Sequence, residues 1–185
     1  MTKITVGWQE YLTLPDLGIP SIAVKVDTGA KTSALHVQDI TPSADSKTVQ
    51  FRICLRRRDN PNGLPAHFEK QAIAVESKKA PTPHSPEDLV ALSPIIEAPL
   101  IDYRTITSSN GDPENRHVIA TTIQLGKHQW KTEITLTART SMGFGMLLGR
   151  RAMESRIIVD PGASYLWPLP TSTSSPPTIA PQSLG

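Results

Sequence analysis

The sequence predicts an all-β fold for most of its 185 residues. Several short segments alternate apolar and polar residues with a period of two, which is typical of half-buried strands. Turn signals rich in glycine, proline, asparagine and aspartate separate these segments. Only one brief helix is expected. A chain of this length is expected to form one domain with a sizeable core.

The predicted strands follow one another along most of the chain. They are Lys3–Val6, Tyr11–Leu14, the alternating run that ends at Val26, Ser33–His36, Thr48–Arg57, Leu100–Thr107, His117–Leu125, Trp130–Ala138 and Ile157–Val159. The segment Asp39–Ser46 has the composition of a loop. The strong turn signal Asp59–Gly63 predicts that His67–Val75 returns as the hairpin partner of the strand before it.

We assign residues 1–168 to one domain. Two segments, one inside this domain and one after it, differ in composition from the rest of the chain. Ser77–Pro99 is interrupted by Pro81, Pro83, Pro86, Pro94 and Pro99. Since proline removes a ladder donor, this segment is predicted to be a long surface excursion, with Leu89–Leu92 able to pin it down. Residues 169–185 are rich in proline, serine and threonine and carry no charge, so we expect a disordered tail.

The charge balance gives little support for nucleic-acid binding. The chain has 19 basic and 17 acidic residues, for a net charge of +2. Its one basic run, Arg56–Arg58, has the character of a solvated strand end, so we predict no nucleic-acid partner. No run approaches the roughly 18 apolar residues of a membrane span, so we predict no membrane partner either.

The single cysteine, Cys54, excludes an intramolecular disulfide and fits a reducing compartment. Its place in an alternating segment predicts a buried thiol and not a nucleophile. The first residues have no apolar signal region. These features predict a cytoplasmic protein.

The chain shows no motif for a metal or a nucleotide. No two of its histidines have the i, i+4 spacing of a helical ligand pair, and HExxH and CxxC are absent, so structural or surface histidines are expected. Gly29–Thr32 resembles part of a phosphate-binding loop, but Ala30 stands where that loop needs a glycine directly before its lysine. We therefore predict no metal, no ATP and no other cofactor.

One stretch, Ala23–Leu35, delivers a carboxylate into a sharp turn. The alternating residues before it predict a strand that ends at Asp27, and Gly29 permits a tight turn. An aspartate at the buried end of a strand is costly unless it is hydrogen-bonded, paired or used. Two interpretations are open, because Asp27 can cap the following turn or can be a reactive group.

A second stretch, Phe144–Arg150, favours the interpretation of Asp27 as a reactive group. Asp27–Ala30 together with Met146–Arg150 resembles the two signatures of retropepsin-like aspartic proteases. Between Gly7 and Trp167 the chain is similar to a bacterial subfamily of these proteins, once labelled ATP-dependent zinc proteases. The residues that carry the likeness are Gly7–Glu10, Asp27–His36, Ser108–Gly111, Met146–Arg150 and Val159–Pro161. The resemblance implies a closed β-barrel, the acid-protease half-fold, with one short helix after the Leu-Leu-Gly-Arg segment.

The resemblance also implies roles for individual residues. Asp27 would be the catalytic carboxylate, and Thr28 would hydrogen-bond across a dimer. Gly29 and Ala30 would shape the loop and contact substrate, and Arg150 would pair with an acidic group near the interface. The substrate-binding flap would have its tip at Ser108, Ser109, Asn110 and Gly111. A plain structural hairpin has the same sequence signature.

Aspartic proteases need two carboxylates that share one proton. One candidate for the second is Asp160, because Val159–Ser164 echoes the stretch around Asp27. Pro161 replaces the threonine there, and the family has an aspartate of no catalytic role at the end of this strand. The other candidate is Asp27 of a second copy, and the closed homodimer is the commonest symmetric assembly. We predict the homodimer.

The resemblance implies a setting beside glutamate-ligase enzymes that tail a ribosomal protein. A peptide or protein substrate with a Glu-rich tail or an isopeptide-like bond is therefore expected. Lys31, Arg104, Arg116 and Lys127 offer complementary charge, although scattered surface charges give the same pattern. The rival from another class is a retropepsin-fold binding module without hydrolysis, associated with ribosomal protein modification. A metal-dependent hydrolase is a third reading, which would require bound metal.

Overall fold

The computed structural model describes residues 2–57, 60–61, 63–72, 89–107, 113–138 and 144–170. Strands make up most of this part of the chain, and its one α-helix is a single short turn. In chain order the elements are β1 (Ile4–Val6), β2 (Gln9–Leu14), the 3-10 turn η1 (Pro15–Leu17), β3 (Ile19–Val26), β4 (Ser33–Pro42), β5 (Thr48–Arg56), β6 (Glu69–Ala72), β7 (Leu89–Leu92), β8 (Ile96–Thr107), β9 (Pro113–Leu125), β10 (His128–Thr137), β11 (Met146–Leu148), α1 (Arg150–Met153) and β12 (Ile157–Val159).

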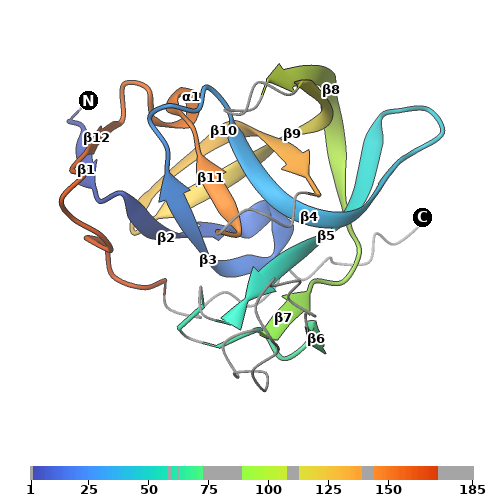
Figure 1. Ribbon diagram of the computed structural model, residues 1–185, viewed down its shortest axis with the longest axis horizontal. Helices are drawn as coiled ribbons and strands as arrows, with labels where there is room; N and C mark the ends of the chain where they lie inside the picture. The colour runs from blue at the N-terminus through green and yellow to red at the C-terminus, as the bar shows by residue number, and fades with distance from the viewer. Residues whose placement is uncertain are drawn as a thin grey trace, which may run out of the picture.

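The main sheet curls back on itself (Figure 1). Among the described strands its order is β10-β4-β11-β3-β2-β9-β8-β5-β7-β6. Two further pairings, β10 with β9 and β4 with β5, join strands that stand far apart in this order. The hydrogen-bonded strands therefore form a ring. The all-β class and the short helix after the Leu-Leu-Gly-Arg segment are confirmed.

The core lies inside this ring and is built from the alternating apolar residues of the strands. Its largest fully buried side chains are Leu12, Leu14, Ile19, Ile22, Leu35, Phe51, Ile53, Leu55, Ile119, Ile123, Leu125 and Ile134. Burial of one such side chain contributes about 1.5–3 kcal/mol. Because β3 lies between two hydrogen-bonded strands and contributes Ile19 and Ile22 to this core, its end is a rigid place for a functional side chain.

Strand β4 is longer than the sequence predicted. The expected loop began at Asp39, but β4 continues to Pro42. Its register against β5 shifts between Gln38 and Thr41, and Asp39 has a φ of 55°. Asp39 is therefore a bulge residue within the strand, because aspartate tolerates the left-handed region better than most residues do.

The segment after β5 also differs from the prediction. Strand β6 lies within the predicted hairpin partner of β5, but it pairs with β7, and β7 pairs with β5. Ala91 and Leu92 of β7 are buried, although the surrounding prolines favoured a surface excursion. Residues 89–92 and 96–99 of that predicted excursion thus belong to strands, and residues 77–88 lie outside the described residues.

The C-terminal part of the chain forms a small sheet of its own. Strand β12 pairs in parallel with β1 and is not part of the main sheet of the described strands. Of the tail predicted for residues 169–185, residues 171–185 lie outside the described part of the chain. Within the described residues, no helix is long and apolar enough to cross a membrane.

Candidate active site around Asp27

Asp27 is fixed by main-chain hydrogen bonds at the end of β3. The amide of Val26 donates to the carbonyl of Trp8 at 2.9 Å, and the amide of Asp27 donates to the carbonyl of Leu148 in β11 at 2.9 Å. Parallel pairing of β11 with β3 places Leu148 opposite Val26. Asp27 therefore projects from a strand end that is held on both sides.

The carboxylate of Asp27 has two different oxygens. Its Oδ1 accepts hydrogen bonds from the amides of Gly29 at 2.9 Å and Ala30 at 3.1 Å. Its Oδ2 has no hydrogen-bond partner within the described residues, and the side chain is half-buried. The predicted capping role is thus confirmed for one oxygen. The other oxygen is available to water or to a ligand.

The turn after Asp27 leaves little space at its glycine. A Cβ added to Gly29 would lie 3.2 Å from Asp27 Oδ1. Thr28 and Gly29 are exposed, and Ala30 is half-buried. The three residues predicted to shape this loop therefore lie directly around the carboxylate.

The segment after β11 locks the same loop from the other side. The amide of Gly149 donates to Ser33 Oγ at 3.1 Å, and the amide of Arg150 donates to the carbonyl of Ala30 at 2.9 Å. A Cβ on Gly149 would lie 2.4 Å from the carbonyl carbon of Thr32, so no other residue fits without a shift of the backbone. The two sequence signatures thus meet in space.

Arg150 contacts the Asp27 loop through its side chain as well. Its Nη1 donates to the carbonyl of Thr28 at 3.2 Å and lies 3.5 Å from the carbonyl of Gly29. The sequence had suggested an acidic partner. Within the described residues no carboxylate lies at ion-pair distance from this guanidinium, so its partners in one chain are backbone carbonyls.

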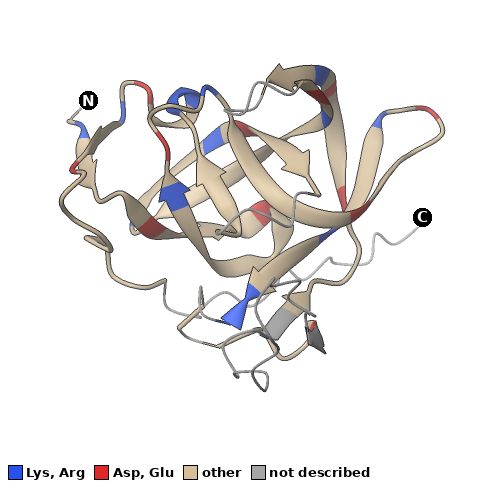
Figure 2. Cartoon of the chain, in the orientation of Figure 1, with Lys and Arg blue, Asp and Glu red and all other residues tan. Residues whose placement is uncertain are grey.

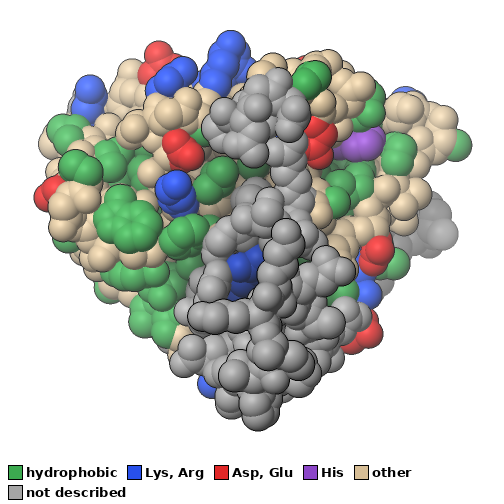
Figure 3. All heavy atoms as spheres, viewed as in Figure 1, with side chains coloured by type: hydrophobic (Ala, Val, Ile, Leu, Met, Phe, Trp, Pro, Cys, Tyr) green, Lys and Arg blue, Asp and Glu red, His purple; other side chains and the backbone are tan. Residues whose placement is uncertain are grey.

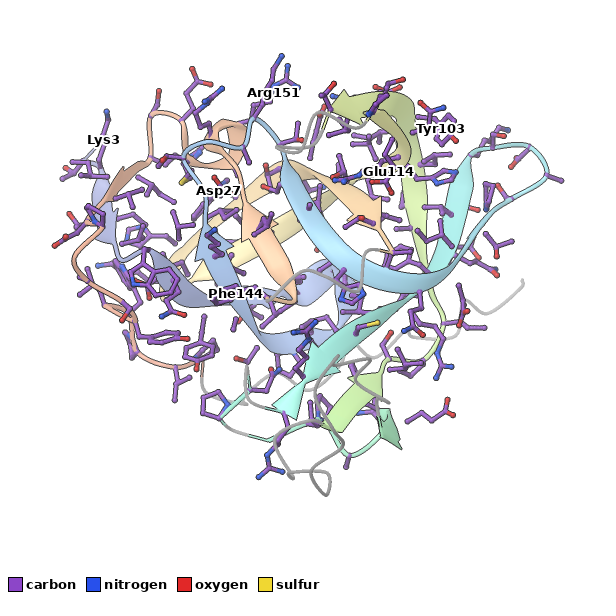
Figure 4. The ribbon with its side chains drawn as sticks, in the orientation of Figure 1. Lys3, Asp27, Tyr103, Glu114, Phe144 and Arg151 are labelled. Atoms are coloured by element: carbon purple, nitrogen blue, oxygen red, sulfur yellow. The ribbon has the colours of Figure 1, made fainter. Side chains whose placement is uncertain are left out.

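The predicted flap corresponds to the hairpin of β8 and β9. The two strands pair up to Thr107 opposite Pro113, and Figure 4 shows Tyr103 and Glu114 on this hairpin and Asp27 at the end of β3. The predicted tip residues Ser108, Ser109, Asn110 and Gly111 lie outside the described residues. The existence of the hairpin is confirmed, and its role as a flap stays a prediction.

The echo of this turn at Asp160 has a structural explanation. Asp160 Oδ1 accepts a hydrogen bond from the amide of Gly162 at 2.9 Å, in the same way that Asp27 accepts from Gly29. Asp160 follows β12, and its amide donates to the carbonyl of Val6 in the small sheet. Both stretches are Asx turns at strand ends. The likeness of the two sequence stretches is therefore explained by the same kind of turn.

Other reactive or metal-binding side chains do not gather in the described structure. No three of its histidine, cysteine, aspartate and glutamate residues lie close enough together to hold a metal ion. Cys54 is buried, and this burial raises the pKa of its thiol to about 12. The thiol is therefore a poor nucleophile near neutral pH, as its position in an alternating strand predicted.

Sequence reasoning gave no role to Glu10, although it lies in a stretch that carries the family likeness. Its buried carboxylate accepts hydrogen bonds from the amides of Gly7, Leu166 and Trp167 at 2.8, 3.0 and 3.3 Å. The sequence predicted that the strand begins at Tyr11, but β2 begins at Gln9. Extending the period of two from Leu12 and Leu14 back to Glu10 would have placed it on the buried face. Glu10 binds the C-terminal segment to the start of β2.

An all-β chain whose Asp-Thr-Gly loop is locked by an apolar-Gly-Arg segment is a retropepsin-like protein. The model of one family in this class, described as RimB-like and as retropepsin-like aspartic endopeptidase RimB, matches residues 5–84 and 69–169. Together these matches cover most of the chain. The chain belongs to this family.

Curated relatives carry a different name. A probable alpha-L-glutamate ligase of Shewanella halifaxensis is 39% identical over 163 residues, which are 88% of this chain and 30% of the relative. A protein of the same name from Parasynechococcus marenigrum is 32% identical over 165 residues, which are 88% of this chain and 29% of the relative. The chain therefore spans less than a third of the length of these relatives.

A solved structure supports the fold alone. The crystal structure of a Legionella pneumophila protein of unknown function aligns with 89% of this chain and 98% of its own, with a TM-score of 0.57. The sequence identity is 20%. At this identity the likeness extends to the architecture and not to the chemistry.

Proposed function

We propose that this protein is an aspartic endopeptidase that works as a homodimer, with Asp27 of each subunit activating one water molecule. The observation that supports this most is the state of the Asp27 carboxylate. One oxygen is held by two amides, and the other has no partner within the described residues at a half-exposed position. Membership of a retropepsin-like aspartic endopeptidase family supports the same reaction.

The reaction needs a second carboxylate, and the described residues of one chain offer no suitable one near Asp27. Asp160 caps its own turn beyond the small sheet. Two copies of Asp27 across a two-fold axis would supply the pair, because neighbouring carboxylates cannot both ionise and so share one proton. The ionised copy would take a proton from the water that attacks the carbonyl carbon, and the protonated copy would donate its proton to the carbonyl oxygen. The C–N bond of the resulting diol would then break as the pair passes a proton to the leaving nitrogen. Exposed Thr28 would hydrogen-bond to the partner loop.

A protein substrate rich in glutamate, or one with an isopeptide-like bond, completes the proposal. The name of the curated relatives, probable alpha-L-glutamate ligase, supports a glutamate-containing substrate. The hairpin of β8 and β9, which pairs as far as Thr107 and Pro113, would cover this substrate. A single cysteine that burial keeps as a thiol fits a cytoplasmic setting.

The test is cleavage of an unbiased peptide library by the parent protein and by Asp27→Asn. Asparagine keeps an Oδ1 acceptor for the amides of Gly29 and Ala30, so the turn is retained while the shared charge is lost. We expect the rate to fall by about 10²–10⁴-fold, which is typical for loss of an acid–base group. Asp160→Asn is the matched control, because the same substitution then falls in the same kind of turn; its activity should stay within about twofold.

Equal activity of Asp27→Asn and the parent protein would move the chemistry to another residue. Library peptides that bind both proteins and are cut by neither would favour the non-catalytic binding module. A rate that falls in Asp160→Asn as strongly as in Asp27→Asn would show that turn stability, and not the carboxylate, controls activity.

A further inference from the structure

The side chain of Lys25 lies on the same face of β3 as Asp27. Val24 and Val26 are buried, whereas Lys25 between them is exposed. Because the amide of Asp27 still donates to Leu148 in β11, the strand alternation continues through Asp27. Residues i and i+2 of a strand share a face and are about 6.6 Å apart. An ammonium group and the candidate catalytic carboxylate are therefore neighbours.

Lys25 forms no ion pair within the described residues. Its cross-strand neighbours are Gln9 on β2 and Leu147 on β11, and neither is acidic. Within the described residues no carboxylate lies at ion-pair distance from Lys25, whereas Lys47 lies 3.6 Å from Asp45. An exposed lysine between a neutral polar and an apolar residue is available to a ligand.

Other cations near Asp27 add to this charge. Lys31 and Arg150 follow in the loop and in the segment that locks it, and in the described structure neither is paired with a carboxylate. Figure 2 shows basic residues at the end of β3 and around α1, on either side of the loop that follows β3. The local field therefore favours an anionic ligand.

We infer that Lys25 is a specificity-determining residue that binds a glutamate or aspartate side chain of the substrate close to the scissile bond. This inference rests on the proposed peptidase function of Asp27. A bound extended peptide has the same residue spacing as β3, so a side chain one or two residues from the scissile bond comes within reach of the flexible lysine. A single ammonium–carboxylate contact at a partly exposed site corresponds to about tenfold in affinity.

Two measurements test this role. The first compares kcat/KM for fluorogenic peptides that carry glutamate or glutamine at each position next to the cleaved bond. We expect the parent protein to prefer the best-placed glutamate about tenfold and Lys25→Met to lose this preference by slowing only the glutamate peptide. Lys25→Glu should invert the preference toward a lysine peptide. Lys131→Met, which removes an exposed lysine from β10, should leave the preference unchanged.

The second measurement uses binding without cleavage. Fluorescence anisotropy of a labelled Glu-rich peptide and its glutamine counterpart is recorded with Asp27→Asn and with the same variant carrying Lys25→Met. The inference is supported if the protein binds the Glu-rich peptide more tightly than its glutamine counterpart and Lys25→Met abolishes this difference. This outcome stands even if no form of the protein cleaves a peptide and the peptidase proposal fails. The inference would be overturned if the parent protein bound and cleaved both peptides equally well, or if Lys25→Met kept the preference for glutamate.

Discussion

Gly149 has no room for a side chain. A Cβ at this position would lie 2.4 and 2.5 Å from the carbonyl carbon and oxygen of Thr32. Since these are backbone atoms of the segment that leads from the Asp27 loop into β4, relief of the clash must move that segment. We expect Gly149→Ala to lower the free energy of unfolding by roughly 2–3 kcal/mol, as overpacking commonly does. Urea denaturation followed by tryptophan fluorescence measures this loss.

Gly162→Ala is the control for this substitution. Its added Cβ would lie 3.4 Å from Asp160 Oδ1, which is ordinary contact, and the residue does not have a positive φ. Its stability should stay within about 0.5 kcal/mol of the parent protein. Equal stability of Gly149→Ala and Gly162→Ala would contradict the close packing of the two signatures.

His36 makes stability depend on pH. Its side chain is buried on β4, and its Nε2 has no partner within the described residues. Desolvation, with a smaller contribution from the charge of Arg56, lowers the pKa of His36 below 6.5. The unfolded chain then binds more protons than the folded chain in the window just below pH 6.5. Folding stability must therefore decrease as the pH falls through that window.

Urea midpoints between pH 5 and pH 8 measure this effect. We expect the decrease below pH 6.5 to be smaller in His36→Leu, which has no titrating group at this position. Part of the decrease should persist, because burial also lowers the pKa of His117. An unchanged slope in His36→Leu would show that His36 does not contribute to the pH dependence.

At the scale of elements, Glu10 joins the start of the chain to its C-terminal segment. Both of its carboxylate oxygens accept hydrogen bonds from backbone amides. Gly7 packs against the same C-terminal segment so closely that an added Cβ would lie 2.5 Å from the carbonyl oxygen of Ala163. Glu10→Gln would turn an NH₂ group toward at least one of these amides. We expect a loss of about 1–3 kcal/mol in the free energy of unfolding, since a buried donor is then left unsatisfied.

Limited proteolysis shows which element is released. We expect Glu10→Gln to be cut faster within residues 160–167 than the parent protein. Glu97→Gln, the same substitution at an exposed strand residue that accepts a hydrogen bond from Gln50, should be cut at the parent rate. Equal cutting of both variants would contradict the clamping role of Glu10.

The sequence predicted the elements around the site better than those far from it. The strand that ends at Val26 and the turn at Gly29 each have a strong local signal, whereas the short helix after Gly149 was expected from the family resemblance. All three are present. The pairing partner of β6 was predicted wrongly, and β7 was not predicted as a strand. The prolines around residues 89–92 disfavour a strand, and the burial of this short apolar run depends on its pairing with β5. The bulge at Asp39 has the composition of a turn, since both use the left-handed region.

The candidate site was predictable as a list of residues but not as a set of contacts. The meeting of Asp27 and Gly149 depended on the resemblance, because no spacing rule joins residues so far apart. The carbonyl partners of Arg150 and the unpaired charge of Lys25 required coordinates.

Apolar side chains gather on the left of the face in Figure 3. The large apolar residues that are exposed in the described chain include Trp8, Tyr165 and Leu166.

At the scale of the whole molecule, the proposed reaction requires two chains. A dimer that carries Asp27 on only one subunit separates a shared carboxylate pair from two independent sites. Such a mixed dimer is obtained by co-expression of parent and Asp27→Asn chains with different tags, followed by purification over both tags. Light scattering then shows whether the purified species is a dimer.

Peptide cleavage by this mixed dimer is the most direct measurement. If the two copies of Asp27 share one water and one proton, the mixed dimer should have a rate close to that of the Asp27→Asn homodimer. A rate of about half that of the parent homodimer would mean independent sites. That result, or a parent protein that cleaves peptides while light scattering shows only monomers, would contradict the shared Asp27 pair.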